Sequence, residues 1–109
     1  MTFDDAAADL VTEYQTNARR SIEHLQRRID LALMPFFRGA RMSAISTTDV
    51  RTFVAKRQEA GASNATINRE LSALKRAYSL ALQAGKLLHR SYIAMLEEDN
   101  TRTGFFEAE

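Results

Sequence analysis

The sequence predicts an all-α protein in which four helices are followed by an irregular tail. In four stretches of the 109 residues, apolar side chains recur at intervals of three and four, which is the spacing of one helix face. Pro occurs once and Gly four times, and no stretch alternates apolar and polar residues as a half-buried strand would. A chain of this length fits one domain with a modest core. We therefore expect a compact four-helix bundle.

The first helix is expected to begin near Thr2, whose hydroxyl can accept hydrogen bonds from free N–H groups of the first turn. Asp5, three residues later, completes a capping box. The predicted core face of this helix consists of Phe3, Ala7, Leu10, Val11 and Tyr14.

The second helix is expected from about Ser21 to Met34, because Pro35 disfavours a helical conformation in the residue before it. Its inward face would consist of Ile22, Leu25, Ile29 and Leu33. Residues 36–46 are then interpreted as a loop, with Gly39 in a turn between Arg38 and Arg41. Three apolar residues of this loop would plug the core: Phe36, Phe37 and Ile45.

The third helix is expected to start after Thr47 or Thr48, either of which can cap it, and to end at Gly61. Asp49 is favourable in its first turn because the helix dipole attracts negative charge there. The side chains predicted to face the core are Val50, Phe53 and Val54.

The fourth helix is expected over residues 64–83, with Ser63 as its cap and Gly85 as its stop. Its apolar stripe consists of Ile67, Leu71, Leu74, Tyr78, Ala81 and Leu82. At 100° per residue, a second arc without any carboxylate gathers Asn68, Arg69, Ser72, Lys75, Arg76, Ser79 and Gln83.

Charge is distributed unevenly along the chain although the net charge is only +1. Residues 1–16 carry −4, residues 17–57 carry +6, residues 58–96 carry +3 and residues 97–109 carry −4. A basic centre is typical of a surface that meets a polyanion. Clustered Arg on helices is equally often a solvated face, so charge alone leaves both interpretations open.

The polar arc of the fourth helix suits DNA, because Lys and Arg neutralise phosphates while Asn, Ser and Gln can hydrogen-bond to base edges. The second helix offers another basic face, which consists of Arg20, His24, Arg27 and Arg28. The alternative is that both are ordinary solvated faces of amphipathic helices, and residue spacing does not decide between the two.

Several classes of function find no support in the sequence. Without Cys there is neither a disulfide nor a thiolate metal site, and His24 and His89 are too far apart to suggest zinc, so we expect no metal and no cofactor. Tyr14 and Tyr78 lie on apolar stripes and Tyr92 lies in the tail, which favours packing over nucleophilic roles. No catalytic residue is assigned. The acidic N-terminus lacks the features of a secretory signal, which predicts a cytoplasmic protein that does not enter membranes.

Residues 61–87, GASNATINRELSALKRAYSLALQAGKL, resemble the last helix of the core-binding domain of phage-type tyrosine recombinases, or integrases. That family has the form G-x-S-x-x-T-I-N-R-x-L-x-x-L-K-R at this place. Here it reads Gly61, Ser63, Thr66, Ile67, Asn68, Arg69, Leu71, Leu74, Lys75 and Arg76. Residues 45–58 and 19–29 are similar to the preceding family helices, and the resemblance covers about residues 10–87.

The resemblance implies a SAM-like orthogonal bundle over residues 1–96 and a linker over residues 97–109 that leads to a catalytic domain. The tail from Glu98 to Glu107 is similar to the family's connector, and we expect the catalytic domain to be absent from this chain, which would then be no enzyme by itself. The resemblance further implies a bacterial, prophage-type protein that is monomeric as an isolated domain. Its partners would be double-stranded DNA and, in the full-length protein, other recombinase subunits.

By this resemblance the domain clamps one face of a recombination site, and the second and fourth helices meet the DNA. The backbone contacts expected are Arg20, Arg28, Ser63, Thr66, Arg69, Lys75 and Arg76, and the base-edge contacts expected are Asn68 and Ser72. Ser63 and Thr66 could instead serve only as N-cap and first-turn residues. The alternative function is a helical protein-interaction module that contacts a partner or a neighbouring subunit.

Overall fold

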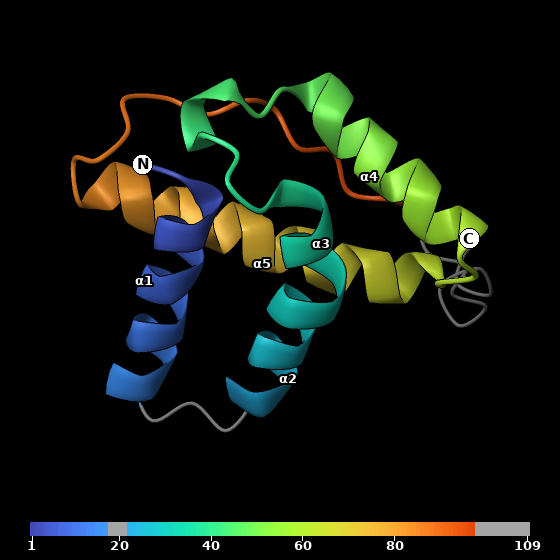
Figure 1. Ribbon diagram of the computed structural model, residues 1–109, viewed down its shortest axis with the longest axis horizontal. Coiled ribbons are helices and arrows are strands. Elements are labelled where there is room, and N and C mark those ends of the chain that lie inside the picture. The colour runs from blue at the N-terminus through green and yellow to red at the C-terminus, as the bar shows by residue number, and fades with distance from the viewer. Residues whose placement is uncertain (18–21, 98–109) are drawn as a thin grey trace, which may run out of the picture.

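The computed structural model describes residues 1–17 and 22–97, and within them it confirms an all-α architecture with no β-strand. The α-helices are α1 (Phe3–Thr16), α2 (Ile22–Arg28), α3 (Met34–Phe37), α4 (Thr47–Glu59) and α5 (Asn64–Gln83). A π-helical turn (Ile29–Leu33) joins α2 to α3, and a 3₁₀ turn (Met42–Ala44) precedes α4. As Figure 1 shows, α1 and α2 lie side by side and cross α5, while α4 lies on the other side of the molecule.

The core is centred on α5, whose 20 residues contact α1, α2, α4 and the π-helical turn. Ile67, Leu71 and Leu74 are completely inaccessible to solvent, as the helical spacing predicts. Tyr78 is also buried, and its hydroxyl donates a hydrogen bond of 2.7 Å to the carbonyl of Met42. This bond satisfies the one polar atom of the Tyr78 side chain inside the core and ties the 3₁₀ turn to α5.

The capping of α1 is as predicted, whereas the cap of α4 is not. Thr2 and Asp5 form the expected capping box, in which each side chain bonds the other residue's backbone N–H. At α4 the same box is formed by Ser46 and Asp49, at 3.1 Å and 2.9 Å, so neither Thr47 nor Thr48 is the cap. The reason is spacing, because the box needs its acidic residue three positions after the cap.

Pro35 does not end the second helical run, contrary to our prediction. The chain passes from α2 through the π turn into α3, and the N–H of Met34 bonds the carbonyl of Ile29, five residues back. A proline ring normally clashes with the carbonyl four residues before it, and the wider π turn relieves that conflict. Pro35 then lies in the first turn of α3, where a missing N–H leaves no hydrogen bond unmade.

The expected loop over residues 36–46 is therefore shorter, and its two phenylalanines belong to α3. They still fill the core as predicted. The ring centroids of Phe36 and Phe37 lie 5.6 Å and 5.4 Å from that of Phe53, so α3 packs against α4 through aromatic contacts. Gly39 makes the predicted turn, and Ile45 is buried.

The bounds of α5 agree with the sequence, and glycines follow both α4 and α5. Gly61 and Gly85 have positive φ angles of 92° and 75°, which favour glycine. After each, the next N–H reaches back five residues, from Ala62 to Arg57 and from Lys86 to Ala81, at 3.1 Å and 2.9 Å. These bonds close both helix ends in the manner of a Schellman motif.

After α5 the chain turns back and runs beside α5 in the opposite direction, and beside α4 in the same direction as α4, as the orange to red trace in Figure 1 shows. We call residues 90–97 the strap. Its Ile93 is only 6% exposed and belongs to the core, although the strap forms no helix or strand. The predicted linker beyond residue 97 lies outside the described residues. Within the described ranges, no helix is long and apolar enough to span a bilayer.

Candidate nucleic-acid interface

A hollow of about 140 Å³ lies where α1, α2 and α5 meet. It is lined by Tyr14, Leu25, Arg28, Arg69, Ser72 and Ala73. None of these lining residues is acidic, so two guanidinium groups and the hydroxyl-bearing residues Tyr14 and Ser72 share an opening without a neutralising carboxylate in its wall. Guanidinium groups bind phosphate oxygens through paired N–H donors, so the hollow is chemically suited to a phosphate.

Two arginines and one serine of the lining come from two helices that are far apart in the sequence. Arg69 and Ser72 are three positions apart on α5, which places them on the same face of the helix, and both are exposed. Arg28 is the last residue of α2 and is half-buried. The packing of α2 against α5 thus joins the two basic faces that the sequence predicted separately.

Two further basic residues of the predicted arc extend this surface along α5. Lys75 and Arg76 are both half-buried. A guanidinium nitrogen of Arg76 lies 3.3 Å from a carboxylate oxygen of Glu13 on α1, so part of its charge is already balanced within the protein. The Arg76 side chain still keeps 40% of its surface exposed.

Ser63 and Thr66 have the structural roles that the sequence left as an alternative. The Ser63 hydroxyl accepts the N–H of Thr66 at 3.2 Å, which caps α5, and it donates to the Thr66 hydroxyl at 3.0 Å. These bonds account for both residues without a ligand.

Asn68 does not occupy the position expected of a base-reading residue. It is only 6% exposed, and its side-chain amide donates to the Leu96 carbonyl at 2.8 Å while the Leu96 N–H donates to Asn68 Oδ1 at 2.7 Å. Asn68 lies at the border of the polar arc, and the strap covers that border. In the structure the side chain of Asn68 therefore binds the strap.

Residues 11–85 match the family described as phage integrase, N-terminal SAM-like domain. The chain belongs to this family. Neither a curated protein nor a solved structure matches the chain at a significant level. The family assignment confirms the expected SAM-like fold and identifies a recombinase-related, DNA-binding type of domain. The matched range contains the entire hollow and ends before the strap begins.

Further basic side chains of this integrase SAM-like domain lie on α2 and on the strap. Arg27 and His24 are exposed on α2, and the predicted contact Arg20 lies outside the described residues. Arg90 was missed by the sequence analysis. It is exposed on the strap, and one guanidinium nitrogen lies 3.4 Å from both the Lys75 carbonyl and the Ser79 hydroxyl on the polar arc of α5. No local signal marks it, because it follows the helix stop in a segment without periodicity.

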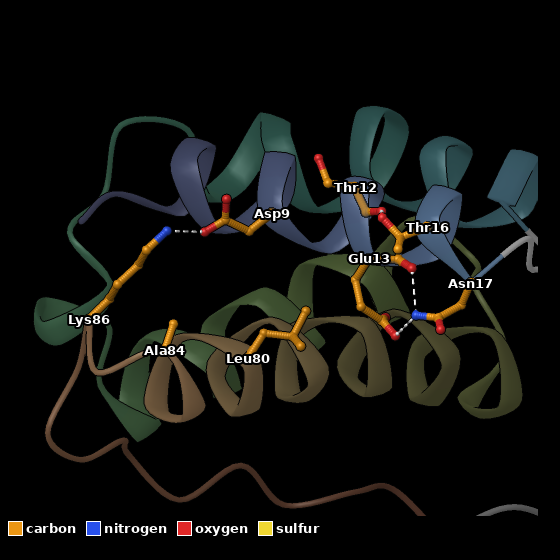
Figure 2. A pocket seen from close by; sticks show the side chains of 8 residues that line it. All are labelled: Asp9, Thr12, Glu13, Thr16, Asn17, Leu80, Ala84 and Lys86. Atoms are coloured by element: carbon orange, nitrogen blue, oxygen red, sulfur yellow. Dashed lines mark hydrogen bonds and ion pairs between the residues drawn. The ribbon is translucent and has the colours of Figure 1, made fainter.

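A second hollow of the integrase SAM-like domain, between α1 and α5, has different chemistry (Figure 2). Its walls include Asp9 and Glu13, and the single ammonium group, that of Lys86, is paired with Asp9 at 2.7 Å. Glu13 accepts a hydrogen bond of 2.8 Å from the side chain of Asn17. Two carboxylates with one paired cation disfavour a phosphate, so this hollow is not the candidate interface. In the described ranges, no group of three or more potential ligands could hold a metal ion.

Proposed function

We propose that this domain is the non-catalytic DNA-binding arm of a site-specific recombinase of the integrase type, and that it grips one face of the recombination site. The observation that carries the proposal is the convergence of Arg28, Arg69 and Ser72 on one hollow without an acidic wall. Arg28 and Arg69 would hold phosphates of the DNA backbone. Ser72, exposed beside them, would be the residue nearest to base edges.

The number of cations on this surface sets the expected strength of binding. Arg28, Arg69, Lys75 and Arg76 could neutralise about four phosphates, each releasing counterions from the DNA. The logarithm of the association constant should then fall with the logarithm of salt concentration with a slope of about −3 to −4. Because Arg76 also pairs with Glu13, we expect a slope nearer to about −3 than to −4.

The proposal is tested by NMR titration of the ¹⁵N-labelled 109-residue chain with duplex DNA at low and at moderate salt. Amide shifts should concentrate at Arg28, Arg69, Ser72 and Lys75 and weaken as salt rises. The amide of Arg51, an exposed residue of α4 outside the hollow, is the internal reference. An absence of shifts at low salt would refute DNA binding and would favour a domain that contacts another protein.

A further inference from the structure

The strap runs antiparallel to α5 and is fixed to it at both ends. At its start, Arg90 contacts the Lys75 carbonyl and the Ser79 hydroxyl, both at 3.4 Å. At its end, Asn68 binds the backbone of Leu96, and the side-chain amide of Asn64 donates to the Glu97 carbonyl at 2.9 Å. Residues later in the strap therefore contact residues earlier in α5, as expected for two antiparallel segments.

The two bonds between Asn68 and Leu96 form the tightest of these attachments. A carboxamide offers one donor and one acceptor side by side, so it can bind both the C=O and the N–H of a single residue, as a neighbouring β-strand would. At 6% exposure the Asn68 side chain has little access to water, and a buried amide needs such partners. Asn68 binds only backbone atoms of Leu96, so these bonds fix the position of the strap whatever side chain is present at position 96.

The middle of the strap is held by α4 and by the segment before it. Thr47 Oγ1 donates to the Tyr92 carbonyl at 2.8 Å, and the Ser91 hydroxyl donates to the Ile45 carbonyl at 3.0 Å. Between them and Leu96, the side chain of Ile93 is buried in the core. The strap is therefore seated along its length, and a loss of the Asn68 bonds would free its end first.

We propose that Asn68 is a positioning residue that fastens the strap to α5 and thereby adds Arg90 to the DNA-facing surface. Arg90 can take part only while the strap is seated, because it comes from a segment without helical structure of its own. The family match ends at residue 85, so the family assignment does not account for this contact. The role of Arg90 rests on the proposed DNA binding, whereas the fastening by Asn68 does not.

The fastening is tested without DNA by amide hydrogen exchange of the 109-residue chain. In Asn68→Ala, exchange of the Leu96 amide should accelerate at least about tenfold relative to amides in the middle of α5, because its acceptor is gone. Thr47→Val, which removes only the bond to the Tyr92 carbonyl, should give a smaller acceleration and serves if Asn68→Ala does not fold. Unchanged Leu96 exchange in a folded Asn68→Ala would overturn the proposal.

The effect on DNA is tested by the salt dependence of binding to a duplex. Arg90→Ala should reduce the magnitude of the log–log slope by about one, as expected for a lost phosphate contact. Asn68→Ala should cause a smaller reduction, because the bonds of Ser91 and Thr47 still hold the strap near Arg90. The double variant should bind no more weakly than Arg90→Ala alone. Arg51→Ala removes the same charge from an exposed site on α4 and should leave the slope unchanged.

The outcomes distinguish the two parts of the proposal, which are the fastening of the strap by Asn68 and the contribution of Arg90 to DNA binding. Additive losses in the double variant, or a wild-type slope in Asn68→Ala despite rapid Leu96 exchange, would show that the strap does not place Arg90 on DNA. If the unmodified chain fails to bind DNA at low salt, the proposed function fails and the role of Arg90 fails with it. The exchange of Leu96 still decides in that case whether Asn68 holds the strap.

Discussion

Arg57 of α4 and Glu70 of α5 form a two-point ion pair, with Nε 2.9 Å from Oε1 and Nη2 2.7 Å from Oε2. Glu70 is a charged residue inside the core, with only 2% of its surface exposed. The hydrogen bonds to Glu70 raise the pKa of Arg57 further above its usual value, so the guanidinium keeps its positive charge. The pair joins α4 to α5, which are also linked by a hydrogen bond from the Gln58 side chain to the Asn64 side chain at 3.2 Å.

Removal of Arg57 should destabilise the domain because it leaves the Glu70 carboxylate buried without its partner. We expect Arg57→Met to lower the free energy of unfolding by about 2–3 kcal/mol. This is less than for a fully buried pair, since 27% of the Arg57 side chain remains exposed. Urea denaturation measures the change. Arg51→Met, at an exposed site on the same helix, should change stability little, and an equal loss in both variants would contradict the role of the pair.

The buried hydroxyl of Tyr78 predicts a loss of stability in alkali. Burial, with a smaller contribution from Asp49, raises the pKa of Tyr78 to about 12. The folded state then holds this proton more tightly than the unfolded chain, whose tyrosine titrates near 10. Its contribution is fully present below about pH 10 and is lost as the pH rises toward 12, by roughly 2 kcal/mol.

Tyr78→Phe isolates this effect. At neutral pH the variant should be less stable by about 1 kcal/mol, because the Met42 carbonyl loses its donor. Between pH 10 and 12 the difference should shrink or reverse, since phenylalanine does not titrate. Thermal unfolding of both proteins across that range measures it. Tyr92→Phe, which changes a tyrosine that is 73% exposed, is the control, and a constant difference between Tyr78→Phe and wild type would refute the prediction.

The cap of α4 gives a prediction that separates Ser46 from its neighbour. Ser46→Ala removes the hydroxyl that accepts the Asp49 N–H and should cost about 1 kcal/mol of stability. Thr48→Ala changes an exposed residue of the first turn and should cost little. Denaturant midpoints of the two variants provide the comparison. A larger loss in Thr48→Ala would show that the cap lies where the sequence analysis first placed it.

The comparison of sequence and structure shows which signals are local. The bounds of α5 could be predicted because Ser63 and Gly85 act within a few residues of each helix end. The cap of α4 was also predictable in principle. Three adjacent residues, at positions 46–48, can cap a helix, and only Ser46 has an acidic residue, Asp49, three positions later. The passage through Pro35 could not be predicted, because the π turn that permits it depends on packing around α3.

The candidate site was predictable to a similar extent. Periodicity placed Arg69 and Ser72 on one face, but only the packing of α2 on α5 brings Arg28 to the same hollow. Asn68 lies within the same arc on a helical projection, and only the strap assigns it elsewhere. Tertiary contacts between segments distant in sequence leave no local pattern, so the strap and Arg90 were not foreseen.

The central claim is that the hollow between α2 and α5 binds the DNA backbone. It is tested most directly by measuring duplex affinity against salt for the unmodified chain, for Arg28→Ser with Arg69→Ser, and for a matched pair, Arg38→Ser with Arg51→Ser. Both pairs remove two exposed or half-buried arginines, but only the first pair lines the hollow. We predict that the first pair lowers the magnitude of the log–log slope by about two and that the matched pair leaves it unchanged. Equal effects of the two pairs would contradict the claim, because binding would then follow net charge alone.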